Sequence, residues 1–307
     1  MFKPTQWQRL VARTIGWTPD KYVPLRVALS PVEAPLYDLR GQELHVGWVL
    51  KHKRERLARF PQLFRVRERD VVIRAELESV DARTTAFRTM SEELRAEKAF
   101  SLWQDELYAA RRVFGDAPLF YFNRGVGSSF GLAQYATHLN GYTRDSRNGS
   151  VDKVWIAKRS ATKLSWPGRL DTMVGGGLPA HTTAMENMVK ESQEEAGLEP
   201  EWTRERLVSC GSISYLLDEP NGLQNNTMFI YDLEMAEGLT PSNTDKEVDG
   251  FELWSVEDVL EALREEPERF KHDICLVLLD FFIRHGMLTP DNFRDLQRLQ
   301  QALHGAS

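Results

Sequence analysis

The sequence has little cysteine and no long apolar run. Only Cys210 and Cys275 occur among its 307 residues, so at most one disulfide can form, and no cysteine spacing typical of a metal site accompanies them. The longest apolar runs fall far short of the roughly 18 residues of a membrane helix, so no membrane span is expected. Two ordinary thiols in a reducing cytoplasm fit this composition best.

Repeats, low-complexity segments and signs of a nucleic-acid module are also missing. No interleaving of aromatic and basic residues resembles such a module, so we expect no nucleic-acid partner. His272 and His285 have no partner at a spacing that would make a zinc site, which indicates structural or exposed histidines. The sequence leaves the oligomeric state open.

Charge is unevenly distributed along the chain. Residues 1–125 carry 22 Lys and Arg against 16 Asp and Glu, whereas the remainder carries 17 against 29. A basic half facing an acidic, metal-binding half would suit an anionic substrate held between them. Equally, these arginines could be scattered over a solvated surface, and composition does not separate the two interpretations.

With 42% apolar residues the chain is long enough for two domains, and its patterns mix helix and strand. We place the boundary at the glycine and serine cluster around Ser128, which gives an N-terminal α+β domain over residues 1–127 and a second domain over residues 128–307. The first domain is expected to open with a short helix whose apolar stripe is Trp7, Leu10, Val11 and Ile15.

Periodicity predicts the remaining elements. In the first domain we expect strands at residues 44–49 and 71–77, and helices at 51–60, 89–96 and 104–114. In the second domain we expect strands at residues 133–142, 153–158, 207–215 and 227–233, and helices at 256–264, 274–285 and 291–304.

The most informative stretch, residues 175–198, reads GGGLPAHTTAMENMVKESQEEAGL. Thr183 followed three residues later by Glu186 is a capping box, which predicts a helix that starts near Ala184. Gly197 can supply the left-handed residue that ends this helix. Small and apolar residues recur at helical spacing and should pack on a sheet. They are Met185, Met188, Val189, Ser192 and Ala196.

Three glutamates of this helix stand close together. Glu191, Glu194 and Glu195 lie at i, i+3 and i+4, which brings their carboxylates onto neighbouring positions of one helix flank. Hard divalent cations such as Mg²⁺ take carboxylate oxygens, water and substrate phosphate, so a cation would relieve the repulsion and create a phosphate site. The alternative is a solvated acidic face.

The stretch resembles the Nudix box, the signature of hydrolases that act on a diphosphate joined to another group. Its pattern is Gly, five residues, Glu, seven residues, Arg-Glu, an aliphatic residue, any residue, Glu-Glu, any residue, Gly and an aliphatic residue. Aligned on Glu194 and Glu195, the pattern sets its first glycine on Gly176 and its Arg-Glu on Lys190 and Glu191. The resemblance implies an α/β/α sandwich with a mixed sheet.

Three positions depart from this pattern. Thr182 stands in place of the first glutamate, Lys190 in place of arginine and Ser192 in place of the aliphatic residue. In the family the first glutamate and the arginine form a structural ion pair. Here Glu186 precedes Lys190 by four residues, and we expect this pair to replace that brace. The departures leave room for a relative that binds ligand without hydrolysing it.

The resemblance extends to one branch of the family. The passages HVGWVLKHKRERLARFPQLFRV and VWIAKRSATKLSWPGRLDTMVGGGLP are similar to a Nudix branch with an extra N-terminal domain, related to the hydrolase part of fungal thiamine pyrophosphokinase. This similarity implies a thiamine diphosphate-like substrate, including oxidised or damaged forms. Trp48, Trp103 and Trp166 are compatible with stacking on its rings and equally with an ordinary core.

Residues on both sides of the box are candidates for the site. Lys163, Arg169 and Asp171 lie just before the glycine turn, where a cation can reach a diphosphate. Trp166 could wall the pocket or fill a corner of the core. The resemblance also implies a loop glutamate after the box that joins the metal or acts as general base, and Glu247 matches that position. Asp249 and Glu252 are the alternatives for this role.

The resemblance and the charges together predict the chemistry. Mg²⁺, with Mn²⁺ as an alternative, would be held by Glu191, Glu194, Glu195 and the Gly176 carbonyl and would orient a water against the diphosphate. Either Glu191 or Glu247 would accept the proton of this water. Three functions stay open: a thiamine diphosphate-type diphosphatase, a Nudix hydrolase of ADP-ribose or a dinucleotide, and a ligand-binding module without catalysis.

Overall fold

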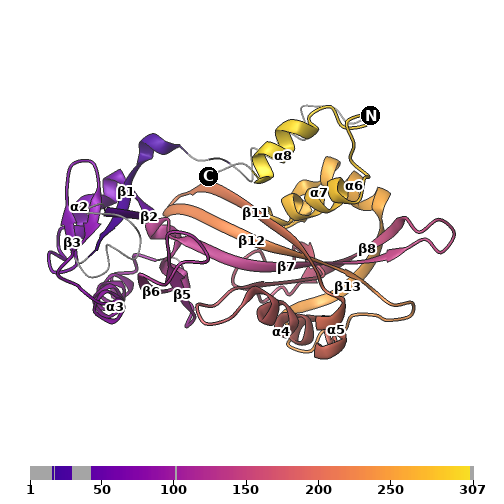
Figure 1. Ribbon diagram of the computed structural model, residues 1–307, viewed down its shortest axis with the longest axis horizontal. Coiled ribbons are helices and arrows are strands. Elements are labelled where there is room, and N and C mark those ends of the chain that lie inside the picture. Colours follow the sequence, from indigo (N-terminus) through magenta and orange to yellow (C-terminus); the bar gives the residue numbers. More distant parts are fainter. Residues whose placement is uncertain (1–15, 17, 30–42, 101, 305–307) are drawn as a thin grey trace.

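The computed structural model describes residues 16, 18–29, 43–100 and 102–304. The opening helix expected around Trp7 to Ile15 lies outside these residues. Figure 1 shows two parts side by side, a smaller N-terminal part drawn in indigo and purple and a larger sheet with helices on both faces.

The N-terminal part consists of short strands and one long helix. A four-stranded sheet runs in the order β2, β1, β4, β3, and β5 and β6 form a separate hairpin. Its strands are β1 (Tyr22–Ala28), β2 (Glu43–Leu50), β3 (Phe64–Val66), β4 (Val71–Ile73), β5 (Leu107–Ala110) and β6 (Phe120–Asn123). Its helices and 3₁₀ turns are η1 (Pro19–Lys21), α2 (Lys51–Leu57), α3 (Val80–Ala96), η3 (Arg124–Val126) and η4 (Ser128–Phe130).

One prediction for this part is wrong, and two others are too long, because β4 ends at Ile73 and α2 ends at Leu57. Residues 104–114 were expected to form a helix, but residues 107–110 form β5, antiparallel to β6, with Tyr108 opposite Phe122. Tyr108 and Phe122 are both buried in the core of the N-terminal part. Strand pairing and burial outweigh the helix propensity of the Leu, Ala and Arg residues in this segment. The helix expected at residues 89–96 is longer and begins at Val80, because Ser79 caps it by accepting the Ala82 N–H.

A mixed sheet of seven strands forms the frame of the larger part, counted over the described residues. Its order is β11, β12, β7, β8, β13, with β10 paired to β7 and β9 paired to β8. β12 runs parallel to β7, and the other pairs are antiparallel. The strands are β7 (Ala133–Arg144), β8 (Val151–Arg159), β9 (Leu170–Thr172), β10 (Val174–Gly177), β11 (Val208–Glu219), β12 (Gly222–Glu234) and β13 (Val248–Ser255).

Helices cover both faces of this sheet (Figure 1). On one face lie α4 (Ala184–Ala196) and α5 (Pro200–Arg206); on the other lie α6 (Val256–Glu265), η5 (Pro267–Arg269), α7 (Ile274–Arg284) and α8 (Leu296–His304). Met188 of α4 and Tyr231 of β12 share one core, whereas Ile230 and Phe281 belong to the core on the opposite face. This arrangement confirms the expected α/β/α class. Among the helices predicted for this larger part, only α8 is clearly shorter than its predicted range.

The two parts share an interface at the β11–β12 hairpin. The Tyr22 hydroxyl lies 2.9 Å from both Asp218 Oδ1 and the Gly222 carbonyl oxygen. Tyr22, Leu50 and Leu223 are buried together between the two parts. The boundary predicted at Ser128 stays a prediction; in the structure Ser128 opens η4, which leads directly into β7.

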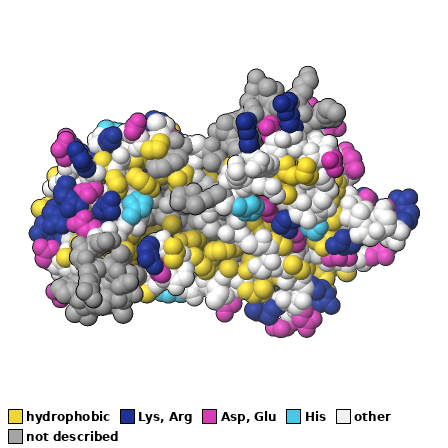
Figure 2. Space-filling model, turned by 45° about the horizontal axis from the view of Figure 1, so that its top comes forward, with side chains coloured by type: hydrophobic (Ala, Val, Ile, Leu, Met, Phe, Trp, Pro, Cys, Tyr) yellow, Lys and Arg dark blue, Asp and Glu magenta, His cyan; other side chains and the backbone are white. Residues whose placement is uncertain are grey.

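The basic residues of the N-terminal part are largely engaged in local ion pairs. Figure 2 shows basic and acidic side chains next to one another at this end of the molecule, on the left of the view. The pairs include Arg59 with Glu93, Arg65 with Glu43, Arg67 with Asp70, and Arg74 with Glu76. These pairs support the interpretation of the charge imbalance as ordinary surface, and they leave few arginines of this part for a ligand.

None of the helices in the described ranges is long and apolar enough to cross a membrane. Cys210 and Cys275 are both free thiols, and Cys275 is buried in the core.

A buried ionic cluster joins β12 to α7. Asp232, which is 3% exposed, accepts hydrogen bonds from Asn140 Nδ2 at 3.0 Å and from Arg284 Nη1 at 2.5 Å, and it lies 2.8 Å from His285 Nε2. Burial alone would raise the pKa of Asp232, but the hydrogen bonds from His285 and Arg284 and the charge of Arg284 lower it to about 2. His285 is therefore structural, as the sequence indicated.

This cluster predicts an acid-sensitive contribution to stability. A carboxyl whose pKa is lowered by folding stabilises the fold above its unfolded pKa, near 4, and the contribution is lost as the pH falls toward 2. Asp232→Asn should lower the free energy of unfolding by about 3–5 kcal/mol at pH 7, because Arg284 loses a buried partner. Urea unfolding from pH 7 to pH 2 measures this loss.

The exposed Asp152→Asn is the control and should change stability by less than about 0.5 kcal/mol. Asp232→Asn should also lose less stability on acidification than the wild type. Parallel acid profiles for the two proteins would refute the role of the cluster.

Candidate active site

Helix α4 begins and ends as predicted. Thr183 Oγ1 accepts the Glu186 N–H at 3.2 Å, the Glu186 carboxylate accepts the Thr183 N–H at 3.1 Å, and Gly197 ends the helix with a φ of 66°. Ser192, which replaces an aliphatic residue of the Nudix box, is fully buried and donates to the Met188 carbonyl at 2.6 Å. The buried hydroxyl is thus satisfied within the helix, and the departure leaves the packing intact.

Close packing against β10 fixes the glutamate flank of α4. A Cβ atom on Gly176 would lie 2.4 Å from the Glu191 carboxyl carbon, and one on Gly175 would lie 2.6 Å from the His138 ring. Neither distance is possible between non-bonded heavy atoms. The glycines of this strand are therefore required so that side chains can approach its backbone.

Glu195 is the most buried of the three glutamates, with 4% of its surface exposed. Its Oε2 accepts the Gly175 N–H at 2.9 Å, and its Oε1 lies 4.0 Å from Lys163 Nζ. Burial raises the pKa of Glu195 to about 8, against the opposing effects of the Gly175 N–H and the Lys163 charge. Burial also raises the pKa of Glu191, against the charge of Lys190. An additional positive charge nearby would stabilise the ionised form of both carboxylates.

The predicted Glu186–Lys190 brace is wrong. Lys190 Nζ lies 2.5 Å from Glu194 Oε2 and 3.3 Å from Glu191 Oε1. The Glu186 carboxylate is instead bound to the Thr183 N–H and hydroxyl at the start of the helix. A carboxylate that serves a capping box is directed toward the helix start and away from the residue four positions later.

The carboxylate oxygens of the α4 glutamates accept hydrogen bonds from lysine side chains and from the backbone. No group of three or more His, Cys, Asp or Glu side chains is placed to hold a metal ion in the part of the chain that the structure describes. Lys163 and Lys190 supply the positive charge beside Glu195 and Glu194 instead. The donors gathered here are all oxygens, which suits a hard cation such as Mg²⁺ once the ammonium groups move away.

The loop before β13 meets the loop after β8 beside the glutamates of α4. Lys163 Nζ forms an ion pair with the Glu247 carboxylate, so two predicted residues from distant segments lie together beside α4. Glu252 instead accepts a hydrogen bond from the Trp254 Nε1 at 2.7 Å, and Asp249 is exposed on β13. Among the three acidic candidates of this segment, only Glu247 lines the site.

Two of the residues predicted for substrate binding have other partners. Asp171 is buried and accepts a hydrogen bond from Arg159 Nη1 at 2.7 Å. Arg159 in turn donates to the carbonyls of Ser165 and Trp166, at 2.9 and 3.1 Å, and so holds the loop that carries Lys163. Asp171 thus supports this loop from behind.

Arg169 is directed away from the site. Its Nη1 donates to the Glu268 carbonyl, and it lines neither of the two cavities described below. Arg159, which sequence reasoning missed, lines the site in its stead. Its only signal in the sequence is its position at the end of a predicted strand, directly before a loop rich in candidate residues.

Two adjoining cavities define the candidate site. The carboxylate cavity, of about 600 Å³, is lined by the predicted residues Lys163, Gly176, Glu191, Glu194 and Glu247, with Glu195 behind its wall. The amide cavity, of about 280 Å³, is lined by polar and aromatic side chains that include Gln134, Trp166, Tyr215, Gln224 and Asn226. Both cavities share Gln104, Arg124, Ala136, Ser165, Gly177 and Lys271, so they lie next to each other.

Trp166 forms part of the amide cavity and is not a core residue. Its side chain is 40% exposed, its φ is +53°, and its ring centroid lies 4.9 Å from that of His272. A tryptophan held in a left-handed backbone conformation is strained by about 1 kcal/mol or more, a cost often found at ligand sites.

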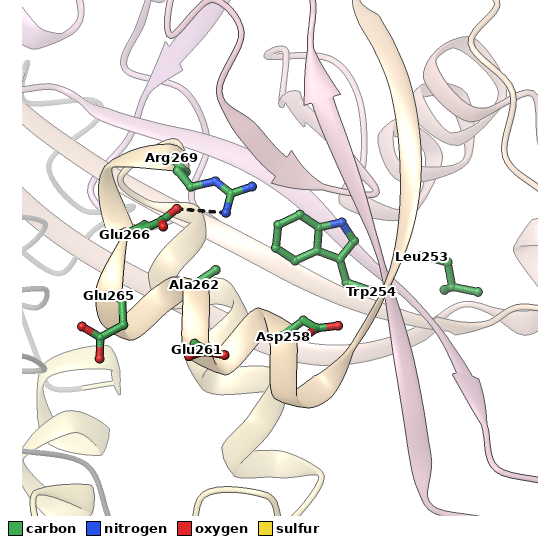
Figure 3. A pocket seen from close by; sticks show the side chains of 8 residues that line it. All are labelled: Leu253, Trp254, Asp258, Glu261, Ala262, Glu265, Glu266 and Arg269. Atoms are coloured by element: carbon green, nitrogen blue, oxygen red, sulfur yellow. Dashed lines mark hydrogen bonds and ion pairs between the residues drawn. The ribbon is translucent and has the colours of Figure 1, made fainter.

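A third hollow, of about 530 Å³, lies elsewhere, between β13 and α6. Figure 3 shows its side chains: the Arg269 guanidinium lies between Glu266 and the Trp254 ring, at 3.0 Å from Glu266 Oε2 and 5.1 Å from the ring centroid. None of the residues predicted for the site lines this hollow. Glu191, Glu194 and Glu247 line the carboxylate cavity instead.

Comparison with known proteins identifies the family. Residues 143–274 match the NUDIX domain, and residues 39–134 match a domain of unknown function, DUF4743. The chain is 33% identical to Nudix hydrolase 24, chloroplastic, of Arabidopsis thaliana, covering 84% of this chain and 70% of that protein.

Two further relatives match a similar share of the chain at similar identity. Nudix hydrolase 20, chloroplastic, of Arabidopsis thaliana is 32% identical, with 84% of this chain and 71% of that protein covered. An uncharacterised protein of Saccharomyces cerevisiae is 31% identical, with 80% and 74% covered. The chain therefore belongs to the Nudix hydrolase family. It is a Nudix-type hydrolase, and such enzymes generally use divalent metals such as Mg²⁺.

The N-terminal part contributes residues that sequence reasoning missed. Gln104, Glu106, Tyr108 and Arg124 all line one or both cavities. Three of them fall in the segment expected to be a helix, and no pattern in the sequence connects them with residues 175–198. Only the three-dimensional packing of β5 and η3 against β10 brings them to the site.

The contact between Gly177 and the N-terminal part can be tested with a double mutant. A Cβ atom on Gly177 would lie 2.1 Å from the Tyr108 hydroxyl oxygen, so Gly177→Ala should lower the free energy of unfolding by about 1–3 kcal/mol. Because Tyr108→Phe removes the nearest clashing atom and leaves the contact with Arg124, the double mutant should recover part of that loss. Urea unfolding of all four proteins measures the coupling; purely additive effects would refute the contact.

Proposed function

We propose that the chain hydrolyses the diphosphate of a small organic diphosphate and releases the organic monophosphate and orthophosphate. The observation that carries this proposal is the carboxylate cavity itself. It gathers Glu191, Glu194, Glu247 and Lys163 around one hollow that adjoins the amide cavity, so charge for a diphosphate lies beside contacts for an organic group.

The proposed metal donors are the carboxylates of Glu191, Glu194 and Glu195 and the carbonyl of Gly176. They suit Mg²⁺, with Mn²⁺ as the alternative, because all are oxygen donors. When bound, a divalent cation supplies positive charge against the diphosphate and the attacking oxygen. Lys190 must then leave Glu194, and Lys163 is placed to contact phosphate oxygens once it leaves Glu247.

The reaction needs one proton acceptor. The oxygen of a water forms a bond to one phosphorus, the bond between that phosphorus and the bridging oxygen breaks, and a carboxylate takes the proton of the water. Glu191 and Glu247 both line the cavity and are the two candidates. Burial raises the pKa of Glu191, which strengthens it as a base if a cation keeps it ionised.

We propose thiamine diphosphate-like compounds, including oxidised or damaged forms, as the substrate class. The similarity of residues 154–179 and of the N-terminal part to the thiamine-related Nudix branch supports this assignment. The amide cavity is compatible with it, because the exposed Trp166 ring can stack on a heteroaromatic ring and side-chain amides can bind its nitrogen atoms. The alternatives are another nucleoside diphosphate derivative, such as ADP-ribose or a dinucleotide, and ligand binding without hydrolysis.

A substrate panel separates these functions. Purified protein with Mg²⁺ is incubated with thiamine diphosphate, its oxo and oxy analogues, ADP-ribose and diadenosine compounds. Orthophosphate from the thiamine set is the expected result, measured together with the thiamine monophosphate-type product. Release of AMP instead would transfer the assignment to nucleoside derivatives. Thermal stabilisation by these ligands without any turnover would establish a binding module and overturn the proposal.

The glutamates of α4 are tested by isosteric substitution. Glu194→Gln and Glu195→Gln should each reduce kcat by about a hundredfold or more, because each removes one charged oxygen donor. The Tm of each variant in EDTA should stay near that of the wild type, while the rise in Tm on adding Mg²⁺ should be lost.

The exposed Glu201→Gln on the neighbouring helix α5 is the matched control and should keep both activity and the response to Mg²⁺. Wild-type turnover in Glu194→Gln or Glu195→Gln would defeat the metal assignment.

A further inference from the structure

Arg124 stands at the junction of the two cavities. It belongs to η3 in the N-terminal part, within the region that matches a domain of unknown function. It lines both the carboxylate cavity and the amide cavity. A Cβ atom on Gly177 would lie 2.7 Å from Arg124 Nη1, so the guanidinium lies directly against β10, next to the glycine whose carbonyl is a proposed metal donor.

The guanidinium is held at one end and available at the other. Arg124 Nη1 donates to Glu106 Oε2 at 2.9 Å, and its guanidinium carbon lies 5.6 Å from the Tyr108 ring centroid. Nε and Nη2 donate to no other residue in the described ranges, and the side chain is 36% exposed. Planar guanidinium groups with free donors bind phosphate oxygens well, often through two hydrogen bonds.

Three other cations near the junction are more fully engaged. Lys163 pairs with Glu247, and Arg159 is bound to Asp171 and two loop carbonyls. Lys271, which also lines both cavities, pairs with Asp273 at 3.0 Å. Arg124 is thus the cation at the junction with the most remaining hydrogen-bonding capacity toward a ligand.

We propose that Arg124 binds the phosphate that remains attached to the organic group, so that the N-terminal part completes the substrate site. This inference rests on the proposed function and deepens it. A diphosphate that spans the two cavities places one phosphate beside the glutamates of α4 and the other at the junction. Attack at the first phosphorus breaks its bond to the bridging oxygen, and the leaving organic monophosphate stays on Arg124.

The proposal assigns a role to the N-terminal part. Glu106 orients the guanidinium through the hydrogen bond to Nη1, and Tyr108 packs beneath it on Gly177. A Nudix domain without this part would lack Arg124, Gln104 and the wall that they form. The class of ligand recognised here is an organic monophosphate or the inner phosphate of an organic diphosphate.

Binding of product analogues tests this role without relying on turnover. Isothermal titration measures the Kd of thiamine monophosphate, AMP and orthophosphate for the full chain with Mg²⁺. Arg124→Gln should raise the Kd of the organic monophosphates by about tenfold or more, because charged hydrogen bonds to the phosphate are lost. Arg124→Lys should recover part of the affinity, and the Kd of orthophosphate should change by less than about threefold.

Arg112→Gln is the matched control, since Arg112 lies in the same part, pairs with one carboxylate at 3.0 Å and is 45% exposed. It should bind like the wild type, and the Tm of each variant confirms that it is folded. Equal affinities of wild type and Arg124→Gln, or no binding of either monophosphate to the wild type, would overturn the proposal.

The failure of this inference differs from the failure of the proposed function. Hydrolysis of a diphosphate in the panel, with monophosphate binding that does not depend on Arg124, would refute the inference and leave the function standing. Binding that depends on Arg124, without hydrolysis of any panel compound, would support the inference and refute the function.

Discussion

The site depends on how closely side chains approach the backbone of β10. Glu191 from α4 lies against Gly176 on one side, and Tyr108 and Arg124 from the N-terminal part lie against Gly177. Any larger residue at these positions would force one of these elements away. The same short strand therefore fixes the distance between the glutamate helix and the N-terminal part, and it makes one site out of segments far apart in the sequence.

Charge balance supports the proposal of a cation at this place. Glu195 is nearly inaccessible to water, and its burial raises its pKa to about 8, so its ionised form needs compensation. Lysines provide that compensation in the structure, with Lys163 beside Glu195 and Lys190 beside Glu194. Lysine side chains are long and mobile, so they can exchange these carboxylates for phosphate oxygens when a divalent cation binds.

The sequence predicted most of the local structure and several of the residues that line the carboxylate cavity. The capping box, the end of α4 at Gly197 and the α/β/α layers depend on short-range patterns, and the structure confirms them. The predicted ion partner of Lys190 was wrong, because the Glu186 carboxylate can serve either the capping box or an ion pair four residues later. In the structure it serves the capping box, and Lys190 pairs with Glu194. Arg124 could not be predicted, because its place at the site follows from long-range packing of a segment whose strand was mistaken for a helix.

The proposed chemistry depends on a divalent-cation site on the flank of α4 that faces β10. Anomalous diffraction from crystals grown with Mn²⁺ would reveal such a site. We expect a peak bound by Glu191, Glu194 and Glu195, with the Gly176 carbonyl as a further donor and the Lys190 ammonium moved off Glu194. A structure with no peak there, or with Mn²⁺ elsewhere and Lys190 still on Glu194, would rule out the proposed cation site.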